Sequence, residues 1–166
     1  NVAANVTIST GNNNIDMTLD DLVLDGTVDA GSGTVTVTDA FNGGIEFGAA
    51  GGGNVKISDT ELGRITAGTF VLSTEATINV DSITAANSTN IANTISLDAT
   101  DATSNDGTVS FGTGGNDSVF AQALVVRADD GITVAANLTS QTGGISLDAD
   151  VDTDGGTLNN TAGAII

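Results

Sequence analysis

LVVRADDGITVAANLTSQTGGISLDA, residues Leu124–Ala149, holds three short segments in which apolar residues alternate with other residues. Alternation with a period of two places one set of side chains on one face, as in a half-buried β-strand. The segments are separated by Asp129–Gly131 and Gln141–Gly144. Gly adopts positive φ and Asp bonds to its own backbone, so both suit tight corners. The stretch therefore predicts strands joined by short turns.

The same pattern recurs along the chain. A shift of 110 positions aligns Val35 with Ile145, and a shift of 54 aligns Phe70 with Leu124. The pentapeptide ISLDA occurs at Ile95–Ala99 and again inside the first stretch. Self-similarity with a period near 20 residues indicates a repeat architecture, in which each unit is too small to bury its apolar face alone and neighbouring units bury it jointly.

The repeated pattern predicts a series of short strands with one apolar face. The expected strands are Val6–Ser9, Ile15–Leu19, Leu22–Val28, Thr34–Thr38, Ile45–Phe47, Asn54–Ser58, Thr69–Ser73, Thr77–Val80, Thr94–Asp98, Thr108–Phe111, Leu124–Arg127, Ile132–Val134, Gly144–Asp148 and Thr157–Leu158. The side chains expected to point inward and stack in columns are Leu22, Leu24, Val35, Val37, Val55, Ile57, Phe70, Leu72, Ile95, Leu97, Leu124, Val126, Ile145 and Leu147.

Three stretches interrupt this rhythm. Glu61–Gly68 is expected to form a turn or a bulged corner, and Asn87–Asn93 and Gly112–Ser118 are expected to form loops. Composition argues against helices elsewhere, because Thr, Val, Ile, Gly, Asp and Asn dominate over strong helix formers. Proline is absent, which suits uninterrupted backbone ladders. We therefore expect an all-β chain with little or no α-helix.

The phrases LVVRADDGITVAANLTSQTGGISLDADV and ISDTELGRITAGTFVLS resemble the repeats of filamentous-haemagglutinin-type exoproteins. These are surface adhesins of Gram-negative bacteria that are exported by two-partner secretion. The resemblance covers roughly Val35 to Leu158, and it does not include the secretion-targeting N-terminal domain of that family. It implies a right-handed parallel β-helix, an extracellular or cell-surface location, and an elongated stalk without catalysis.

These observations together predict one β-solenoid domain over residues 1–166, a single-stranded right-handed parallel β-helix of about seven to nine coils. The right hand follows from the usual sense of parallel crossovers. Natural solenoid domains that fold in isolation carry polar capping repeats at their ends. This chain has VAANVTI near one end and TAGAII at the other, so we expect both ends to be uncapped. Open ladder edges of that kind pair with further strands.

The charge limits the possible partners. The chain has 21 acidic and 3 basic residues and a net charge of −18, which makes nucleic acids and anionic membranes poor partners. No stretch approaches the ~18 consecutive apolar residues of a membrane span. The acids are mostly Asp, which points to turns rather than to general solvation.

Catalysis is not expected. Without His or Cys the chain cannot form the usual nucleophilic triads or zinc sites. Paired carboxylates could hydrolyse glycosides, but the chain offers no Trp or Tyr platform for a sugar. A lyase acting on an acidic polymer would need a basic groove, and Lys56, Arg64 and Arg127 are too few.

The candidate metal site is DADVDTDGG, residues 148–156, with Asp148, Asp150, Asp152 and Asp154 as possible calcium ligands. The last three of these and Gly155 form D-x-D-x-D-G, the opening of a calcium loop in which alternate carboxylates converge on one ion. The twelfth position is Thr161, where an EF-hand has a bidentate Glu. The competing interpretation is an ordinary acidic turn.

A threonine row at Thr34, Thr36 and Thr38 resembles an ice-binding row. Such a surface needs the row to be repeated on neighbouring coils. Asn54–Ser58 does not supply that repeat, so ice binding is not the expected function.

Two functions from different classes remain. The first is structural: a building block of a bacterial surface filament that assembles end to end, or a stalk segment of an adhesin. Its partner would be another copy, joined through Val2–Ile8 and Ala162–Ile166, or the flanking coils of a longer chain. The second is a module that presents calcium-stabilised Asp-rich loops to a cell-surface glycan or receptor.

Overall fold

The computed structural model describes residues 1–49, 53–100, 106–153 and 155–161. Strands account for 51 % of the structure and helices for 5 %, which confirms the all-β class and the expectation of little helix. In chain order the elements are β1 (Thr7–Ser9), β2 (Ile15–Leu19), β3 (Thr27–Asp29), β4 (Thr34–Asp39), β5 (Ile45–Gly48), β6 (Val55–Ile57), α1 (Asp59–Leu62), β7 (Ile65–Thr74), β8 (Thr77–Asp81), α2 (Ala85–Ser88), β9 (Ile91–Ala99), β10 (Thr108–Phe111), β11 (Ser118–Phe120), β12 (Ala123–Ala128), β13 (Gly131–Val134), β14 (Leu138–Ser140), β15 (Ile145–Asp148) and β16 (Thr157–Asn160).

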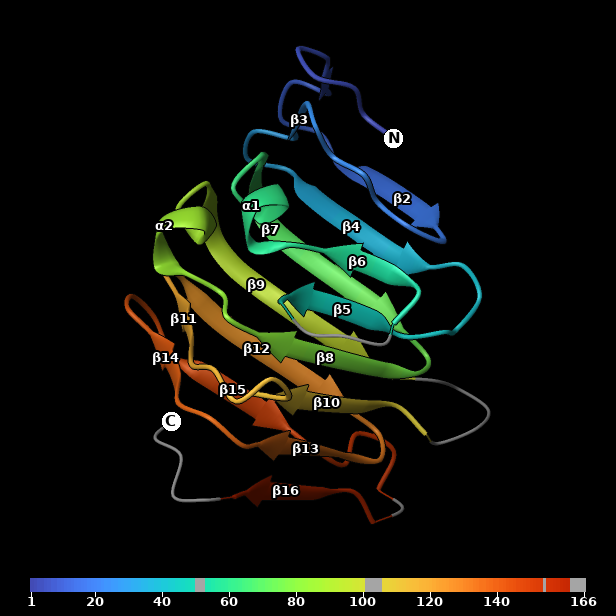
Figure 1. Ribbon diagram of the computed structural model, residues 1–166, viewed down its shortest axis with the longest axis vertical. Helices are drawn as coiled ribbons and strands as arrows, with labels where there is room; N and C mark the ends of the chain where they lie inside the picture. Colours follow the sequence, from blue (N-terminus) through green and yellow to red (C-terminus); the bar gives the residue numbers. More distant parts are fainter. Residues whose placement is uncertain (50–52, 101–105, 154, 162–166) are drawn as a thin grey trace.

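The strands form three sheets, and every strand pair among the described residues is parallel. The largest sheet contains the ladder β2-β4-β7-β9-β12-β15, with β1 and β3 joined to it through β7. The second sheet has the order β16-β13-β10-β8-β5-β6, and β11 pairs with β14 in the third. Figure 1 shows the strands stacked along the long axis, from the N-terminal strands at the top to β16 at the bottom.

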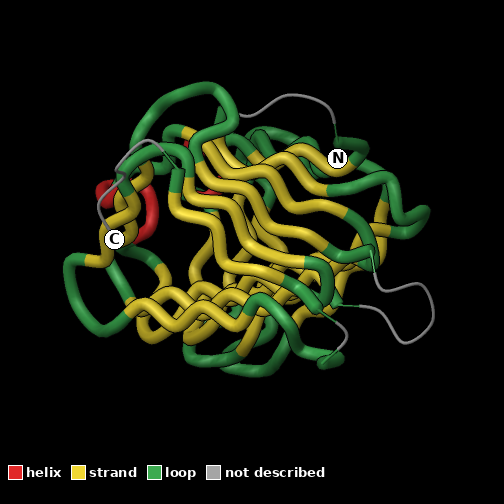
Figure 2. Tube along the Cα trace, turned by 90° about the horizontal axis from the view of Figure 1, so that it is seen from below, coloured by secondary structure: helices red, strands yellow, loops and turns green. Residues whose placement is uncertain are grey.

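From β7 onwards, consecutive strands lie in different sheets, and each strand pairs with one from the previous pass of the chain, except that β11 pairs with β14 from the next pass. Parallel neighbours need such crossovers because a tight hairpin can join only antiparallel strands. Seen along the long axis, strands lie on opposite sides of the interior and the helices lie at one side (Figure 2). The two long ladders are each six strands deep, below the seven to nine coils expected from the repeat period.

The apolar columns follow directly from the strand registers. Two columns run through the largest sheet: Ile15, Val35, Phe70, Ile95, Leu124, Ile145 and, two residues along each strand, Met17, Val37, Leu72, Leu97, Val126, Leu147. Of the fourteen residues predicted to point inward, twelve are buried. Ile145 and Leu147 are only partly buried, because they lie on the outermost strand of the ladder.

Phenylalanines join the three sheets in the core. Phe47 on β5 lies 6.1 Å from Phe70 on β7 and 6.2 Å from Phe120 on β11, measured between ring centroids. All three side chains are fully buried. Tilted aromatic pairs at this separation contribute beyond the area that they bury. The core is therefore continuous between the sheets.

The spacing of the repeat varies more than its sequence period indicated. Along the first column the residue numbers rise by 20, 35, 25, 29 and 21, from Ile15 through Val35, Phe70, Ile95 and Leu124 to Ile145. The longest step contains both β5 and β6, which pair with each other. β6 pairs with β5 on the side away from β8. It therefore does not continue the stack towards the later strands.

Most strand predictions are confirmed within a few residues, and Leu22–Val28 is the clearest error. Only an isolated bridge joins Leu24 to Val2, and β3 begins at Thr27. Asp25 and Gly26 form a bend between these two segments. A side chain at position 26 would lie 2.2 Å from the carbonyl oxygen of Val6, so this bend requires glycine.

The interrupted stretches contain more structure than the predicted turns and loops. Glu61–Gly68 includes the end of α1 and the start of β7, and α2 and β9 overlap Asn87–Asn93. Ser58 and Glu61 form a reciprocal capping box, the S-x-x-E signature of a helix N-terminus. Gly112–Ser118 is a loop up to its last residue, which begins β11. The strands β11 and β14 were not predicted.

Candidate functional site

The Asp-rich segment predicted to bind calcium follows β15. Asp148 ends that strand, and one carboxylate oxygen of Asp150 accepts hydrogen bonds from the backbone N–H groups of Gly155 at 3.1 Å and Gly156 at 3.3 Å. Asp152 is partly buried, and Asp154 lies outside the described residues. In the described part of the chain no three acidic side chains are grouped as metal ligands. Asp150 thus closes a turn, and calcium binding stays a prediction.

Asp81 accepts four hydrogen bonds through its carboxylate. One carboxylate oxygen accepts from the backbone N–H groups of Gly114 and Asn116, at 3.2 and 3.0 Å. The other accepts from the Asn116 side chain at 2.8 Å and from the Ser82 hydroxyl at 3.0 Å. Burial raises the pKa of Asp81, but these hydrogen bonds to the ionised form outweigh burial, so its pKa lies below the ordinary value. Asp81 therefore holds the loop between β10 and β11.

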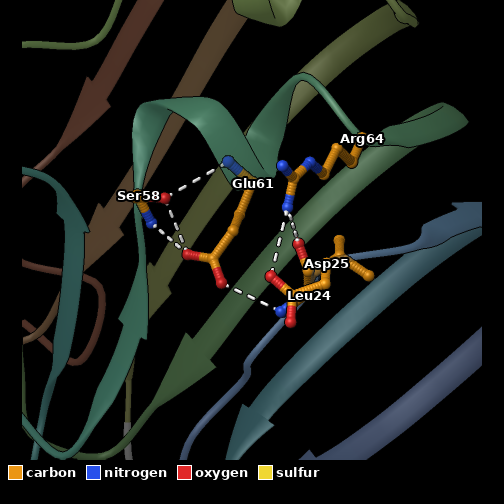
Figure 3. Close-up of polar contacts among 5 residues, drawn as sticks. All are labelled: Leu24, Asp25, Ser58, Glu61 and Arg64. Carbon is orange, nitrogen blue, oxygen red and sulfur yellow. Dashed lines mark hydrogen bonds and ion pairs between the residues drawn. The ribbon is translucent and has the colours of Figure 1, made fainter. Parts of the chain in front are cut away.

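A second polar cluster ties α1 to an earlier segment of the chain (Figure 3). One carboxylate oxygen of Glu61 accepts hydrogen bonds from the backbone N–H and the hydroxyl of Ser58. The other accepts from the backbone N–H of Leu24, at 3.0 Å. Arg64 donates to the Leu24 carbonyl and lies 3.8 Å from the Asp25 carboxylate. The cluster fastens the 24–25 segment to the corner before β7, so its charged groups are engaged in holding the fold.

Two further charged sites, at Arg127 and Glu46, also lie in contacts between strands. Arg127 lies 3.6 Å from Asp98 on the neighbouring strand. Glu46 is buried and in register with Lys56 and Asn79. One of its oxygens accepts from the Gly53 N–H, and the other has no hydrogen-bond partner among the described residues. These contacts contain no pair of carboxylates facing a common cleft, which glycoside hydrolysis would need.

The two ends of the stack expose strand edges. At one end β15 and β16 each pair on one side only with described strands, and Leu158 on β16 is 50 % exposed. At the other end β1 and β2 are the outermost strands, with Val6 48 % and Ile8 39 % exposed. Within the predicted contact Val2–Ile8, Val2 is already buried against Leu24. The other predicted contact, Ala162–Ile166, lies outside the described residues.

The threonine row has different neighbours from those that the sequence suggested. Thr34, Thr36 and Thr38 pair with Thr69, Val71 and Ser73 on β7, and not with Asn54–Ser58. The next strand, β9, continues the row with Thr94, Ser96 and Asp98. The argument against a repeated hydroxyl surface was therefore wrong, because it assumed that the next strand in the sequence is the next strand in the sheet.

Comparisons with models of protein families, with curated proteins and with solved structures find no match to this chain. Each of the two helices in the described residues has four residues, too few to cross a membrane.

Proposed function

We propose that this chain is a structural segment of a right-handed parallel β-helix in an extracellular bacterial fibre or adhesin stalk, where its role is reach and rigidity. The observation that carries the proposal is the pair of parallel ladders, whose apolar columns run in register along the whole stack. The hand rests on the usual sense of parallel crossovers. The extracellular location rests on the resemblance to filamentous-haemagglutinin-type repeats.

Rigidity follows from the direction of the hydrogen bonds. In stacked parallel strands the backbone hydrogen bonds lie along the stacking axis, so bending the stack requires many of them to be distorted together. The carboxylates add ties between levels, as Asp81 does for the Asn116 loop and Glu61 for Leu24. An enzyme would instead need a cleft with free acid and base groups.

The stack would extend through its exposed edges. The half-buried Ile145 and Leu147 end two columns whose members on β4, β7, β9 and β12 are fully buried, so another strand placed on β15 would bury them as well. Unpaired edges rich in apolar side chains favour pairing with a further strand. That strand would come from a second copy in head-to-tail contact, or from the flanking coils of a longer chain. Contacts between unlike ends produce an open polymer unless a rotation closes a ring.

Sedimentation of the purified chain over a range of concentrations tests end-to-end assembly, together with electron microscopy of the same samples. We expect head-to-tail oligomers that dissociate in a Leu147→Lys, Leu158→Lys variant, because Lys on an edge strand opposes pairing. Thr133→Lys on the outward face of β13 is the control and should assemble normally. A wild-type monomer at every concentration would contradict the self-assembling subunit.

The stalk form of the proposal is tested by a tandem fusion of two copies. If the edges continue the same ladders, the fused protein unfolds in one transition at a higher temperature than the single copy, because two edges become buried. Two independent transitions at the single-copy temperature would contradict continuation of the stack.

The alternative function, a calcium-stabilised module that binds a cell-surface glycan or receptor, stays a prediction. A glycan array probed with and without calcium would test it, and binding that disappears in Asp150→Asn, Asp152→Asn would favour it over the structural role.

A further inference from the structure

The outward face of β4, β7 and β9 carries a regular grid of side chains. Three columns cross these strands: Thr34, Thr69, Thr94; Thr36, Val71, Ser96; and Thr38, Ser73, Asp98. All nine side chains are partly exposed, while the residues between them are buried. Neighbouring columns are two residues apart on each strand, and neighbouring strands are about 4.8 Å apart, so the groups repeat in two dimensions. We call the seven Thr and Ser residues of this face the hydroxyl grid.

The hydroxyls of the grid have no hydrogen-bond partner among the described residues. Other aligned threonines of this protein do bond to each other, as Thr7 does with Thr27 and Thr77 with Thr108, both at 2.8 Å. Thr34 and Thr69 are aligned in the same way without such a bond. The hydroxyl grid therefore presents its donors and acceptors to whatever lies outside the sheet.

This face of the sheet is also nearly free of charge in a chain whose net charge is −18. Among the nine residues of the three columns the one ionisable side chain is Asp98, which is paired with Arg127 and accepts a hydrogen bond from the Thr100 hydroxyl at 2.7 Å. The next acid, Asp16, lies at the margin on the edge strand β2, beside Thr36. A face without net charge fits a neutral partner, because a charged polymer gains nothing from it.

A neutral partner that uses every column must itself repeat in two dimensions. The lattice of ice and the surface of a crystalline neutral polysaccharide both do. Sugar surfaces are usually met by aromatic rings, and the grid has none. Thr instead presents a methyl and a hydroxyl on a side chain with few rotamers, so ordering it against a lattice costs little entropy. We propose that the hydroxyl grid is an ice-binding face. The inference does not depend on end-to-end assembly.

Thermal hysteresis and inhibition of ice recrystallisation by the purified chain test the proposal. We expect both activities in the wild type and their loss in Thr36→Lys, because a long charged side chain at the centre keeps the face away from the ice surface. Thr133→Lys, on the outward face of the other large sheet, is the matched control and should retain both activities. Thr36→Val keeps the shape and removes one hydroxyl, and should lower the activity less than Thr36→Lys.

Circular dichroism melts of each variant establish that an inactive protein is still folded. Absence of both activities in the folded wild type would overturn the proposal, as would full activity in folded Thr36→Lys. Co-sedimentation with insoluble cellulose and chitin is run in parallel. Binding to either polymer that Thr36→Lys abolishes, without any effect on ice, would also overturn it and assign the face to a polysaccharide.

Discussion

Asp side chains of this chain close turns and connect segments that are distant in the sequence. One oxygen of Asp29 accepts from the Gly31 N–H at 2.8 Å, and Asp59 accepts from both the N–H and the hydroxyl of Thr84. A short carboxylate reaches nearby backbone groups with little loss of side-chain freedom. This accounts for the preference for Asp over Glu in so acidic a chain.

Replacing Asp81 with Asn should lower the free energy of unfolding at neutral pH by about 1–3 kcal/mol, because the loop N–H groups of Gly114 and Asn116 lose a charged acceptor. The folded-state pKa of Asp81 is below its ordinary value of 3.8, so the ionised carboxylate stabilises the fold above that pH. That contribution is lost as the pH falls through the lowered folded-state pKa. Urea unfolding at neutral pH and at steps below pH 3.8 measures the difference between the two proteins.

The difference in the free energy of unfolding between wild type and Asp81→Asn should therefore become smaller in acid. Asp130→Asn, at an exposed acid, serves as the control and should leave stability at neutral pH nearly unchanged. A difference in the free energy of unfolding that stays constant through the acid range would mean that Asp81 acts through its shape and not through its charge.

Calcium should raise the melting temperature if Asp150, Asp152 and Asp154 act together as ligands, because an ion that binds only the folded state stabilises it. The triple Asp→Asn variant should then lose that response. Melting curves with calcium and with magnesium at equal ionic strength separate specific binding from screening. Equal responses in wild type and variant would assign the segment to an ordinary turn, in agreement with the bonds from Asp150 to Gly155 and Gly156.

At the scale of strands, each apolar residue is stabilised by its neighbours above and below in the column. Leu97 on β9 lies between Leu72 and Val126 and is fully buried. Leu147 on β15 has Val126 on one side only and is partly buried. The same residue type in the same column thus occupies two environments.

Leu97→Ala should lower the free energy of unfolding by about 2–5 kcal/mol, as expected for a cavity in a closed core. Leu147→Ala should lower it by roughly 1–2 kcal/mol, because the half-exposed side chain at the edge buries less apolar area on folding than Leu97 does. Denaturant unfolding of both variants at low protein concentration measures the two changes in the free energy of unfolding. Equal costs would indicate that another segment or another copy covers β15.

At the scale of the whole molecule, charge opposes the stacking that the core favours. With 21 acidic and 3 basic residues, neighbouring levels repel one another. Monovalent salt should therefore raise the melting temperature, and most steeply at low ionic strength, where the Debye length is on the order of 30 Å. Calorimetry over a series of chloride concentrations tests this. A melting temperature that is independent of salt would show that the acids are already neutralised by their local contacts.

Most strands and their inward faces were predictable from the sequence, because both depend on local alternation with a period of two. Ile15–Leu19 and Thr108–Phe111 have the predicted bounds, and twelve of the fourteen inward residues are buried. The absence of proline and the scarcity of helix formers likewise indicated an all-β chain. The D-x-D-x-D-G pattern identified an acidic turn but not its occupant.

Only the tertiary structure decided which strands are neighbours. β6 lies beside β5, and Thr34–Asp39 lies beside β7, because the lengths of the connections vary and the alternation is the same in every strand. The contacts of Asp81 with Gly114 and of Glu61 with Leu24 likewise join residues that are 33 and 37 positions apart. Local patterns carry no information on such distances, whereas burial of the columns selects one pairing from many that look equivalent in the sequence.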